Sequence, residues 1–196
     1  LLVHDIDGDS DLDILLPGHN ALLRNMSGNF ASERLVTHAV ERPGAAIPVG
    51  GALVADLVGD SRPELVIASE GGYPLLYQQS AGGRYSSKPV EIKLPSGLLK
   101  QPTALTAGDI DGDGDLDVWL AQYKQPFVSG QMPTPYYDAN DGNPSTLLIN
   151  QGGGVFTDGT EAAGLASKRN RRTYSASWVD LDDDRGPLAA KVLAFE

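Results

Sequence analysis

Cysteine is absent from this 196-residue sequence, histidine occurs only three times, and there is no run of about 18 apolar residues. Without cysteine there is no disulfide framework, no thiolate nucleophile and no cysteine-ligated metal or haem site. Without a long apolar run we expect no membrane-spanning helix, and residues 1–4 show no signal-peptide pattern. No Gly-x-Ser-x-Gly motif accompanies the histidines, so we expect no enzyme activity.

Positive charge is also scarce, because 15 basic residues face 26 acidic ones and the formal net charge is −11. The acids are not spread evenly. Seventeen of them lie in four nine-residue windows, and the rest of the chain carries a net charge of +4. We call these windows the first to fourth acidic loops; they are residues 5–13, 56–64, 109–117 and 180–188. The negative charge is therefore concentrated in local sites. Because the chain as a whole carries −11, it should be repelled by a phosphate backbone, and we expect no nucleic-acid partner.

A second phrase follows each of the first three acidic loops, so the chain is an internal repeat. The phrase begins with Leu-Leu at residues 22, 75 and 147 and ends in a glycine-containing turn. Short apolar runs bounded by Gly, Pro or Asp flank the loops, which is typical of buried strands. We expect strands at the Leu-Leu phrases and at 1–3, 14–16, 52–55, 65–68, 90–94, 105–107, 118–121 and 175–179, and one helical turn within 161–167.

One repeat therefore spans about 50 residues and holds three or four strands and one acidic loop, which is the size of a β-propeller blade. A β-sandwich gives no reason for the repeat, and a β-solenoid repeats over far fewer residues. We predict an all-β fold with about three and a half propeller blades in one domain. The repeats are 1–40, 41–100, 101–170 with an insertion at 123–145, and the start of a fourth at 171–196.

Aspartates occupy every second position of the first and third acidic loops. In a tight loop such carboxylates point toward one centre, where they repel each other unless a cation is present. Calcium suits the site because it accepts six to eight oxygen ligands in flexible geometry, whereas magnesium demands a tighter octahedron. The candidate ligands are Asp5, Asp7, Asp9, Asp11 and Asp13 in the first loop, and Asp109, Asp111, Asp113, Asp115 and Asp117 in the third. Solvated Asp-Gly turns are the alternative.

The first nine loop positions are also similar to those of an EF-hand. An EF-hand needs a bidentate Glu at position 12, but Leu16 and Leu120 stand there. Its flanks are helices, whereas the flanks here are strand-like. We therefore expect a calcium loop between two strands.

The other two acidic loops depart from this pattern. The fourth has leucine at its ninth position, and its candidate ligands are Asp180, Asp182 and Asp184. The second has valine at its third position, and its weaker candidate ligands are Asp56, Asp60 and Glu64. Arg62 intrudes there and could pair with one of these acids in place of a metal. We expect two bound calcium ions, with a third if the fourth loop binds.

The pattern Asp-x-Asp-Gly-Asp-Gly-Asp-Leu-Asp at 109–117, with the glycine-rich phrase at 150–158, resembles the FG-GAP/VCBS repeat of integrin α chains and many bacterial surface and secreted proteins. Residues 150–165 and 177–180 are particularly similar to the ASPIC/UnbV and cartilage-acidic-protein branch. The resemblance implies a β-propeller whose loop positions 1, 3, 5 and 9 bind calcium through side chains and position 7 through its carbonyl oxygen. Asp11 and Asp115 would then contribute main-chain oxygens.

Propellers of this kind close with about seven blades, and propellers in general with four to eight. Three interpretations therefore stay open: a fragment of a longer chain, subunits that complete a ring together, and an open array. We favour a fragment, because an exposed blade edge invites strand pairing with neighbours.

The resemblance also implies structural calcium sites on one propeller face and partner-binding loops on the other. The insertion at 123–145 should lie on the partner face, where its candidate contacts for a protein or sugar are Phe127, Tyr136, Tyr137 and Asp138. A packed surface loop without a ligand is the alternative. The basic cluster at 168–172 lacks interleaved aromatics, which favours a solvated connecting loop over a nucleic-acid patch.

We therefore predict a non-catalytic, calcium-binding module for extracellular adhesion or protein recognition. Millimolar external calcium would keep the loops occupied, so we expect a secreted, cell-surface or periplasmic protein. The absence of cysteine then suggests a bacterial source. The alternative function is a scaffold or accessory domain, with carbohydrate binding as one role, of a larger secreted enzyme.

Overall fold

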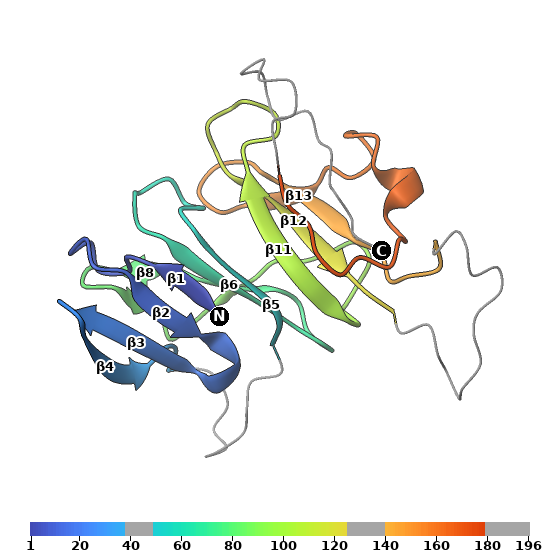
Figure 1. Cartoon of the computed structure of the whole chain (residues 1–196). Helices are drawn as coiled ribbons and strands as arrows, with labels where there is room; N and C mark the ends of the chain where they lie inside the picture. The colour runs from blue at the N-terminus through green and yellow to red at the C-terminus, as the bar shows by residue number, and fades with distance from the viewer. Residues whose placement is uncertain (38–48, 125–139, 179–196) are drawn as a thin grey trace, which may run out of the picture.

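The computed structural model describes residues 1–37, 49–124 and 140–178 (Figure 1). Over these residues the protein is all-β, as predicted. The helical elements there are two three-residue 3-10 turns, η1 (Pro17–His19) and η2 (Ala166–Lys168). In this described part of the chain no helix has the length and apolar character needed to cross a membrane.

Three four-stranded antiparallel sheets make up most of the described structure, and we call each of them a blade (Figure 1). Blade one consists of β1 (Leu2–His4), β2 (Asp13–Leu16), β3 (Ala21–Met26) and β4 (Asn29–Arg34). Blade two consists of β5 (Val49–Ala55), β6 (Glu64–Ser69), β7 (Leu75–Tyr77) and β10 (Val90–Glu91). Blade three consists of β11 (Pro102–Gly108), β12 (Asp117–Gln122), β13 (Thr146–Asn150) and β14 (Phe156–Asp158).

Each acidic loop of the three blades joins the first strand to the second at the same register. The residue before the loop pairs with the ninth loop position, as His4 with Asp13, Ala55 with Glu64 and Gly108 with Asp117. The third strand of each blade is the Leu-Leu phrase, which pairs antiparallel with the second strand. The repeat seen in the sequence is therefore a repeat of structure.

Three local predictions need correction. Residues 175–178 contain no strand; a strand needs a hydrogen-bonded partner, and the next apolar run lies beyond the described residues. The helical turn expected within 161–167 is a hydrogen-bonded turn followed by η2. The glycine-rich turn of the second repeat closes an additional hairpin of β8 (Gln79–Ser80) and β9 (Arg84–Tyr85), which lies between β7 and β10 in the chain.

The hydrophobic core lies between blades. In β6, Leu65 and Ile67 pack with residues of blade one, while Val66 and Ala68 pack with residues of blade three. Successive side chains of a strand point to opposite faces of the sheet. Blade two is therefore buried on both faces, which explains why the run 65–68 is apolar without interruption.

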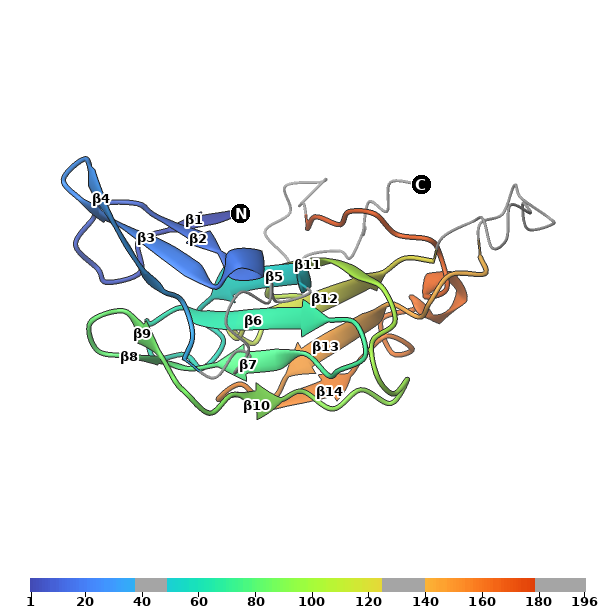
Figure 2. The same ribbon diagram turned by 90° about the horizontal axis from the view of Figure 1, so that it is seen from below.

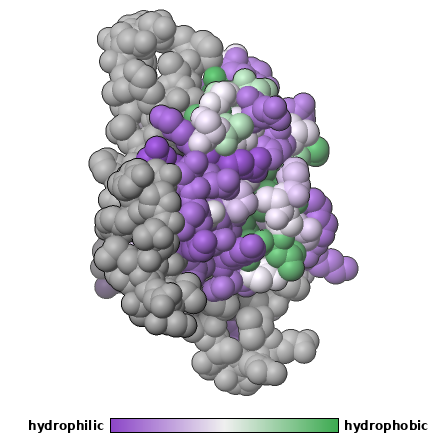
Figure 3. Space-filling view, turned by 90° about the vertical axis from the view of Figure 1, so that its right-hand side faces the viewer, coloured by the Kyte–Doolittle hydropathy of each residue, from purple (hydrophilic) through white to green (hydrophobic). Residues whose placement is uncertain are grey.

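The outer faces of blades one and three differ. On blade three, Trp119 is covered by Leu165 and Trp178 from the segment after β14. On blade one, Val3 and Phe30 are each 51% exposed. The outer face of blade one is thus an apolar sheet surface that no described element covers. By contrast, the face on the right-hand side of Figure 1 is mostly hydrophilic over its described residues (Figure 3).

The inner strands β1, β5 and β11 are neighbours, and all three acidic loops lie at the same end of the blades (Figures 1 and 2). Gly50 packs so closely on β11 that a Cβ there would lie 2.0 Å from the carbonyl oxygen of Pro102. At the end opposite the acidic loops, a cavity of about 470 Å³ is lined by η1, Gly50 and Thr103 among others. The acidic loops and this cavity therefore lie at opposite ends of the blades.

Candidate metal centres in the acidic loops

The first aspartate of each described loop shapes the backbone. Counting loop positions from this residue, Asp5 accepts the N–H groups of positions four, five and six at 2.8, 3.2 and 2.9 Å. Asp56 accepts the same three groups, and Asp109 accepts those of positions four and six. Position four is glycine in these three loops, with φ between 79° and 83°, a left-handed conformation that glycine adopts without strain. The three loops therefore share one backbone conformation, including the second loop, which lacks an aspartate at its third position.

The ninth position is a buried carboxylate that ties the loop to the third strand. Asp117 is fully buried; its Oδ2 accepts the N–H of Ile110 at 2.9 Å and its Oδ1 that of Asn150 at 2.8 Å. Asp13 does the same with Ile6 and Asn25 at 3.1 and 2.7 Å. Burial raises the pKa of Asp117, the two N–H groups oppose this, and the charges of Asp111 and Asp113 raise it further. The carboxylate is thus a structural acceptor with excess negative charge beside it.

Glu64 occupies the ninth position of the second loop. It is buried, and its Oε2 accepts the N–H groups of Leu57 and Val58 at 3.0 and 3.1 Å. Burial raises the pKa of Glu64, although the backbone hydrogen bonds lower it in part. The ninth acid is therefore needed for loop structure in all three blades.

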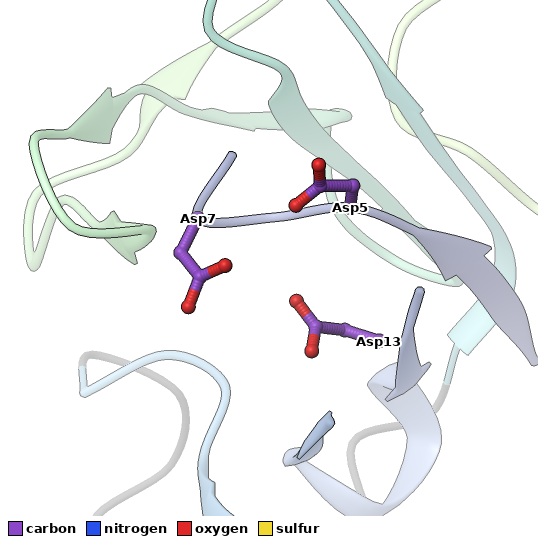
Figure 4. A group of neighbouring side chains, drawn as sticks. All are labelled: Asp5, Asp7 and Asp13. Carbon is purple, nitrogen blue, oxygen red and sulfur yellow. The ribbon is translucent and has the colours of Figure 1, made fainter. Parts of the chain in front are cut away.

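The third position decides where carboxylates converge. Asp5, Asp7 and Asp13 point toward one another, and each offers one oxygen within 4.8 Å of the others (Figure 4). Asp109, Asp111 and Asp117 form the equivalent group in the third loop. In the second loop Val58 takes this position. Convergence therefore follows from an aspartate at position three.

The remaining aspartates hold backbone groups. Asp9 and Asp113, at position five, accept the N–H of position seven at 2.8 and 2.9 Å and lie outside the converging groups. The side chain of Asp11 accepts the N–H of Ser27, at 2.8 Å, in the turn after β3. The alternating pattern thus supplies carboxylates that converge, at positions one, three and nine, and others, at positions five and seven, that lie outside the converging groups.

Arg62 supplies a positive charge to the second loop. Its guanidinium forms an ion pair with Asp60, and the hydrogen bonds to Arg62 lower the pKa of Asp60. This confirms the predicted pairing of Arg62 with one of the loop's acids and identifies Asp60 as the partner. Asp56 has a different role, because its side chain caps the loop backbone.

Two amide side chains join the loops of neighbouring blades. Gln79 Nε2 of the β8–β9 hairpin donates to the carbonyl of Ile6 in the first loop at 2.9 Å, and Asn150 Nδ2 of blade three donates to the carbonyl of Leu57 in the second loop at 2.9 Å. Both carbonyls belong to loop position two. Sequence reasoning missed these contacts; the available signal was a polar amide inside the second and third Leu-Leu phrases, three or four residues after the first leucine.

Gly83 of the β8–β9 hairpin packs on the first loop. It has φ of +70°, and a Cβ there would lie 2.9 Å from the carbonyl oxygen of Ile6 and 3.1 Å from Arg24 Nη1. Gly83→Ala should therefore destabilise the protein by about 2–3 kcal/mol in urea unfolding, from backbone strain and close contact together. Gly82→Ala is the matched control, since Gly82 has φ of +81° and open space around its Cβ. Equal losses in both variants would contradict the packing contact.

The basic cluster at 168–172 differs from the predicted solvated loop. Arg169 Nη2 pairs with Asp158 at 3.3 Å, and Arg172, 6% exposed, pairs with Asp141 at 2.7 Å. The hydrogen bond from Arg172 lowers the pKa of Asp141. These two ion pairs hold the segment after β14 against β14 and against the segment before β13. The charges of Arg169 and Arg172 are therefore balanced by acids of the same protein.

Several candidate residues lie outside the described part of the chain. They are Asp180, Asp182 and Asp184 of the fourth loop and Phe127, Tyr136, Tyr137 and Asp138 of the insertion. Of the histidines, His4 Nδ1 donates to the carbonyl of Asp5 at 2.9 Å, and His19 lines the cavity at the opposite end.

Known proteins with a similar sequence or fold support this architecture. The FG-GAP-like repeat family matches residues 56–120, which run from the second acidic loop into β12. A search of curated proteins gave no match. Among solved structures, one from work on how an Agrocybe aegerita lectin recognises non-reducing terminal N-acetylglucosamine is similar over 97% of this chain, with 20% identity and a TM-score of 0.52. Our chain covers 40% of that chain.

The fold and these matches together define an all-β protein made of propeller blades with an FG-GAP-like repeat at 56–120. At 20% identity the lectin structure supports the fold alone. The finer likeness to the ASPIC/UnbV branch stays a prediction.

Proposed function

We propose that the protein is a non-catalytic recognition module whose acidic loops bind structural calcium. The observation that carries this proposal is the convergence of three carboxylates at the same place in two blades. Asp7 Oδ1 is buried and has no hydrogen-bond partner, so it is an oxygen that a cation would satisfy. Hard carboxylate oxygens and a flexible loop suit calcium better than a transition metal.

The proposed ligand sets follow loop positions 1, 3, 5 and 9, with the carbonyl of position 7. They are Asp5, Asp7, Asp9 and Asp13 with the Asp11 carbonyl, and Asp109, Asp111, Asp113 and Asp117 with the Asp115 carbonyl. Asp9 and Asp113 would need to turn from position seven toward the centre. Asp180, Asp182 and Asp184 would hold a third ion. Bound ions would join the first two strands of each blade and screen the repulsion within the loops.

The proposed recognition face is the end opposite the acidic loops. Tyr123, which follows β12, stacks with Tyr174 at 4.2 Å between ring centroids, and their hydroxyls are hydrogen-bonded. Tyr174 is 55% exposed. Beside the pair, Asp141 lies between Lys124 and Arg172. An exposed aromatic ring among charged groups is a surface that sugars and proteins use for binding.

Tyr174→Ala should weaken ligand binding by about tenfold, because the exposed ring supplies apolar contact area. Binding is measured first on a glycan array that includes terminal N-acetylglucosamine, the sugar named for the lectin of similar fold. Phe30→Ala, which removes an equally exposed aromatic on blade one, is the matched control. A ligand that binds both variants as tightly as the unaltered protein would place the recognition surface elsewhere.

We further propose that the module works outside the cytoplasm, where millimolar calcium keeps such loops occupied. A larger ring would cover the apolar outer face of blade one, with the additional blades supplied by the same or another chain. The alternative function remains a scaffold or carbohydrate-binding accessory domain of a larger secreted enzyme. Affinity of this module for polysaccharide, together with a catalytic domain on the full-length chain, would favour this alternative over the first function.

A further inference from the structure

Arg24 of β3 reaches into the first acidic loop. Its Nη1 lies 2.5 Å from Asp7 Oδ2 and 3.9 Å from Asp13 Oδ2, so it contacts two of the three converging carboxylates. Its Nε pairs with Glu33 Oε1 of β4 at 2.6 Å, and its Nη2 donates to the carbonyl of Gly83 at 3.3 Å. The side chain is only 16% exposed. The guanidinium is therefore held on several sides and is part of the first loop.

The third loop has no such cation among the described residues. Strand register makes Ile149 the equivalent of Arg24. In both blades the residue after the ninth loop position pairs with a leucine of the third strand, which is Leu23 in blade one and Leu148 in blade three. Arg24 and Ile149 are the residues that follow these leucines. The side chain of Ile149 packs with Trp119 and other apolar residues on the outer face of blade three. Within the described ranges, no basic side chain forms an ion pair with the converging carboxylates of the third loop. Two loops with nearly identical aspartate patterns thus differ by one full positive charge.

We propose that this charge makes the two loops unequal calcium sites, the third tight and the first weak. The inference rests on the proposed calcium function. A calcium ion entering the first loop meets the Arg24 charge within a few ångströms, and it must compete for Asp7 Oδ2, which already accepts from Arg24. Moving Arg24 aside would break its pairing with Glu33 and its contact with the β8–β9 hairpin.

The first loop keeps some capacity for calcium. Asp7 Oδ1 is buried without a hydrogen-bond partner, so one oxygen of the converging group remains unused. Arg24 also carries only one charge against the several carboxylates around it. The first loop should therefore bind at higher calcium concentration than the third, and blade one should depend less on calcium for its order.

The test is isothermal titration of calcium into the calcium-free protein and its variants. Asp111→Asn should remove the tightest binding phase, while Asp7→Asn should leave that phase unchanged. Arg24→Met, which keeps the apolar stem, should tighten the weaker phase by about tenfold or more, since it removes the resident charge. Adding Asp7→Asn to Arg24→Met should abolish this gain. Lys93→Met is the charge-matched control, because Lys93 pairs with Glu91 on the surface, away from the loops.

The outcomes separate the inference from the function on which it rests. If Asp7→Asn and Asp111→Asn each remove a phase of equal affinity, the loops are equal sites and the inference is wrong. If Arg24→Met and Lys93→Met have the same effect, the change is one of net charge and the inference is also wrong. If no variant and no unaltered protein binds calcium, the calcium function fails and the inference fails with it. The Asp7 and Asp111 comparison decides the question even if Arg24→Met does not fold.

Discussion

Replacing Asp117 with alanine should destabilise the protein by about 3 kcal/mol or more, even with no calcium present. The carboxylate is fully buried, and its two oxygens accept the N–H groups of Ile110 and Asn150. Alanine leaves both donors buried without an acceptor, and each such loss costs about 1–3 kcal/mol. The measurement is urea unfolding in the presence of a calcium chelator.

Asparagine at position 117 should rescue little of this loss. An amide offers one oxygen and one NH₂ group, so one of the two backbone donors would face another donor. Asp115→Asn is the matched control, since its side chain is outside the converging group of the third loop. It should change stability by less than about 0.5 kcal/mol. If Asp117→Ala destabilises the protein only when calcium is present, the residue acts as a metal ligand and not as an acceptor that the loop backbone requires.

Chelating calcium should lower the melting temperature of the protein by about 5–10 °C. Burial, with the neighbouring charges of Asp111 and Asp113, raises the pKa of Asp117, so the ionised form of this carboxylate is less favourable here than in water and a bound cation would offset that cost. A ligand present at about one hundred times its dissociation constant stabilises the folded state by about 2.7 kcal/mol per site. The measurement is a thermal melt with EGTA against one with millimolar calcium, together with elemental analysis of the dialysed protein.

The size of the calcium effect should depend on the third loop. In Asp111→Asn most of the difference between the two melts should disappear, while Asp115→Asn should keep it. Magnesium should restore the midpoint less well than calcium, because it demands a smaller, octahedral oxygen shell. An unchanged midpoint in EGTA, with no calcium found by elemental analysis, would overturn the proposed function.

The sequence predicted the blades well because their pattern is local. Most strand pairs of a blade join strands that follow one another in the chain, and short loops connect most of them, so the pattern depends on residues close in sequence. Nearly every expected strand therefore exists close to its expected bounds. The segment 175–178 is the exception, because an apolar run becomes a strand only when another strand pairs with it. The β8–β9 hairpin was missed for the opposite reason: its strands are two residues long and carry no periodic signal.

The candidate site was predictable in part. The sequence by itself determined which loops carry aspartates at positions 1, 3, 5, 7 and 9, and hence that, of the three described loops, only the first and third can gather a carboxylate at position three. The sequence could not show which of those aspartates converge and which lie outside the converging group, because all of them are the same residue at the same spacing. Hydrogen bonds in the folded protein separate these roles. The carboxylate at position nine is buried and accepts backbone N–H groups, and the carboxylate at position five accepts an N–H of the loop backbone.

Tertiary structure alone decided what stands beside each loop. Arg24 is 17 residues from Asp7 in the chain, and Gly83 is 59 residues from Arg24, yet all three meet in the first loop. The equivalent strand position in blade three is an isoleucine facing apolar residues. The net charge of −11 is thus a sum over loops that differ in their neighbours, and those neighbours come from strand pairing and blade packing over long sequence distances. That is why the aspartate pattern identifies candidate calcium loops, while only the packed blades distinguish one loop from another.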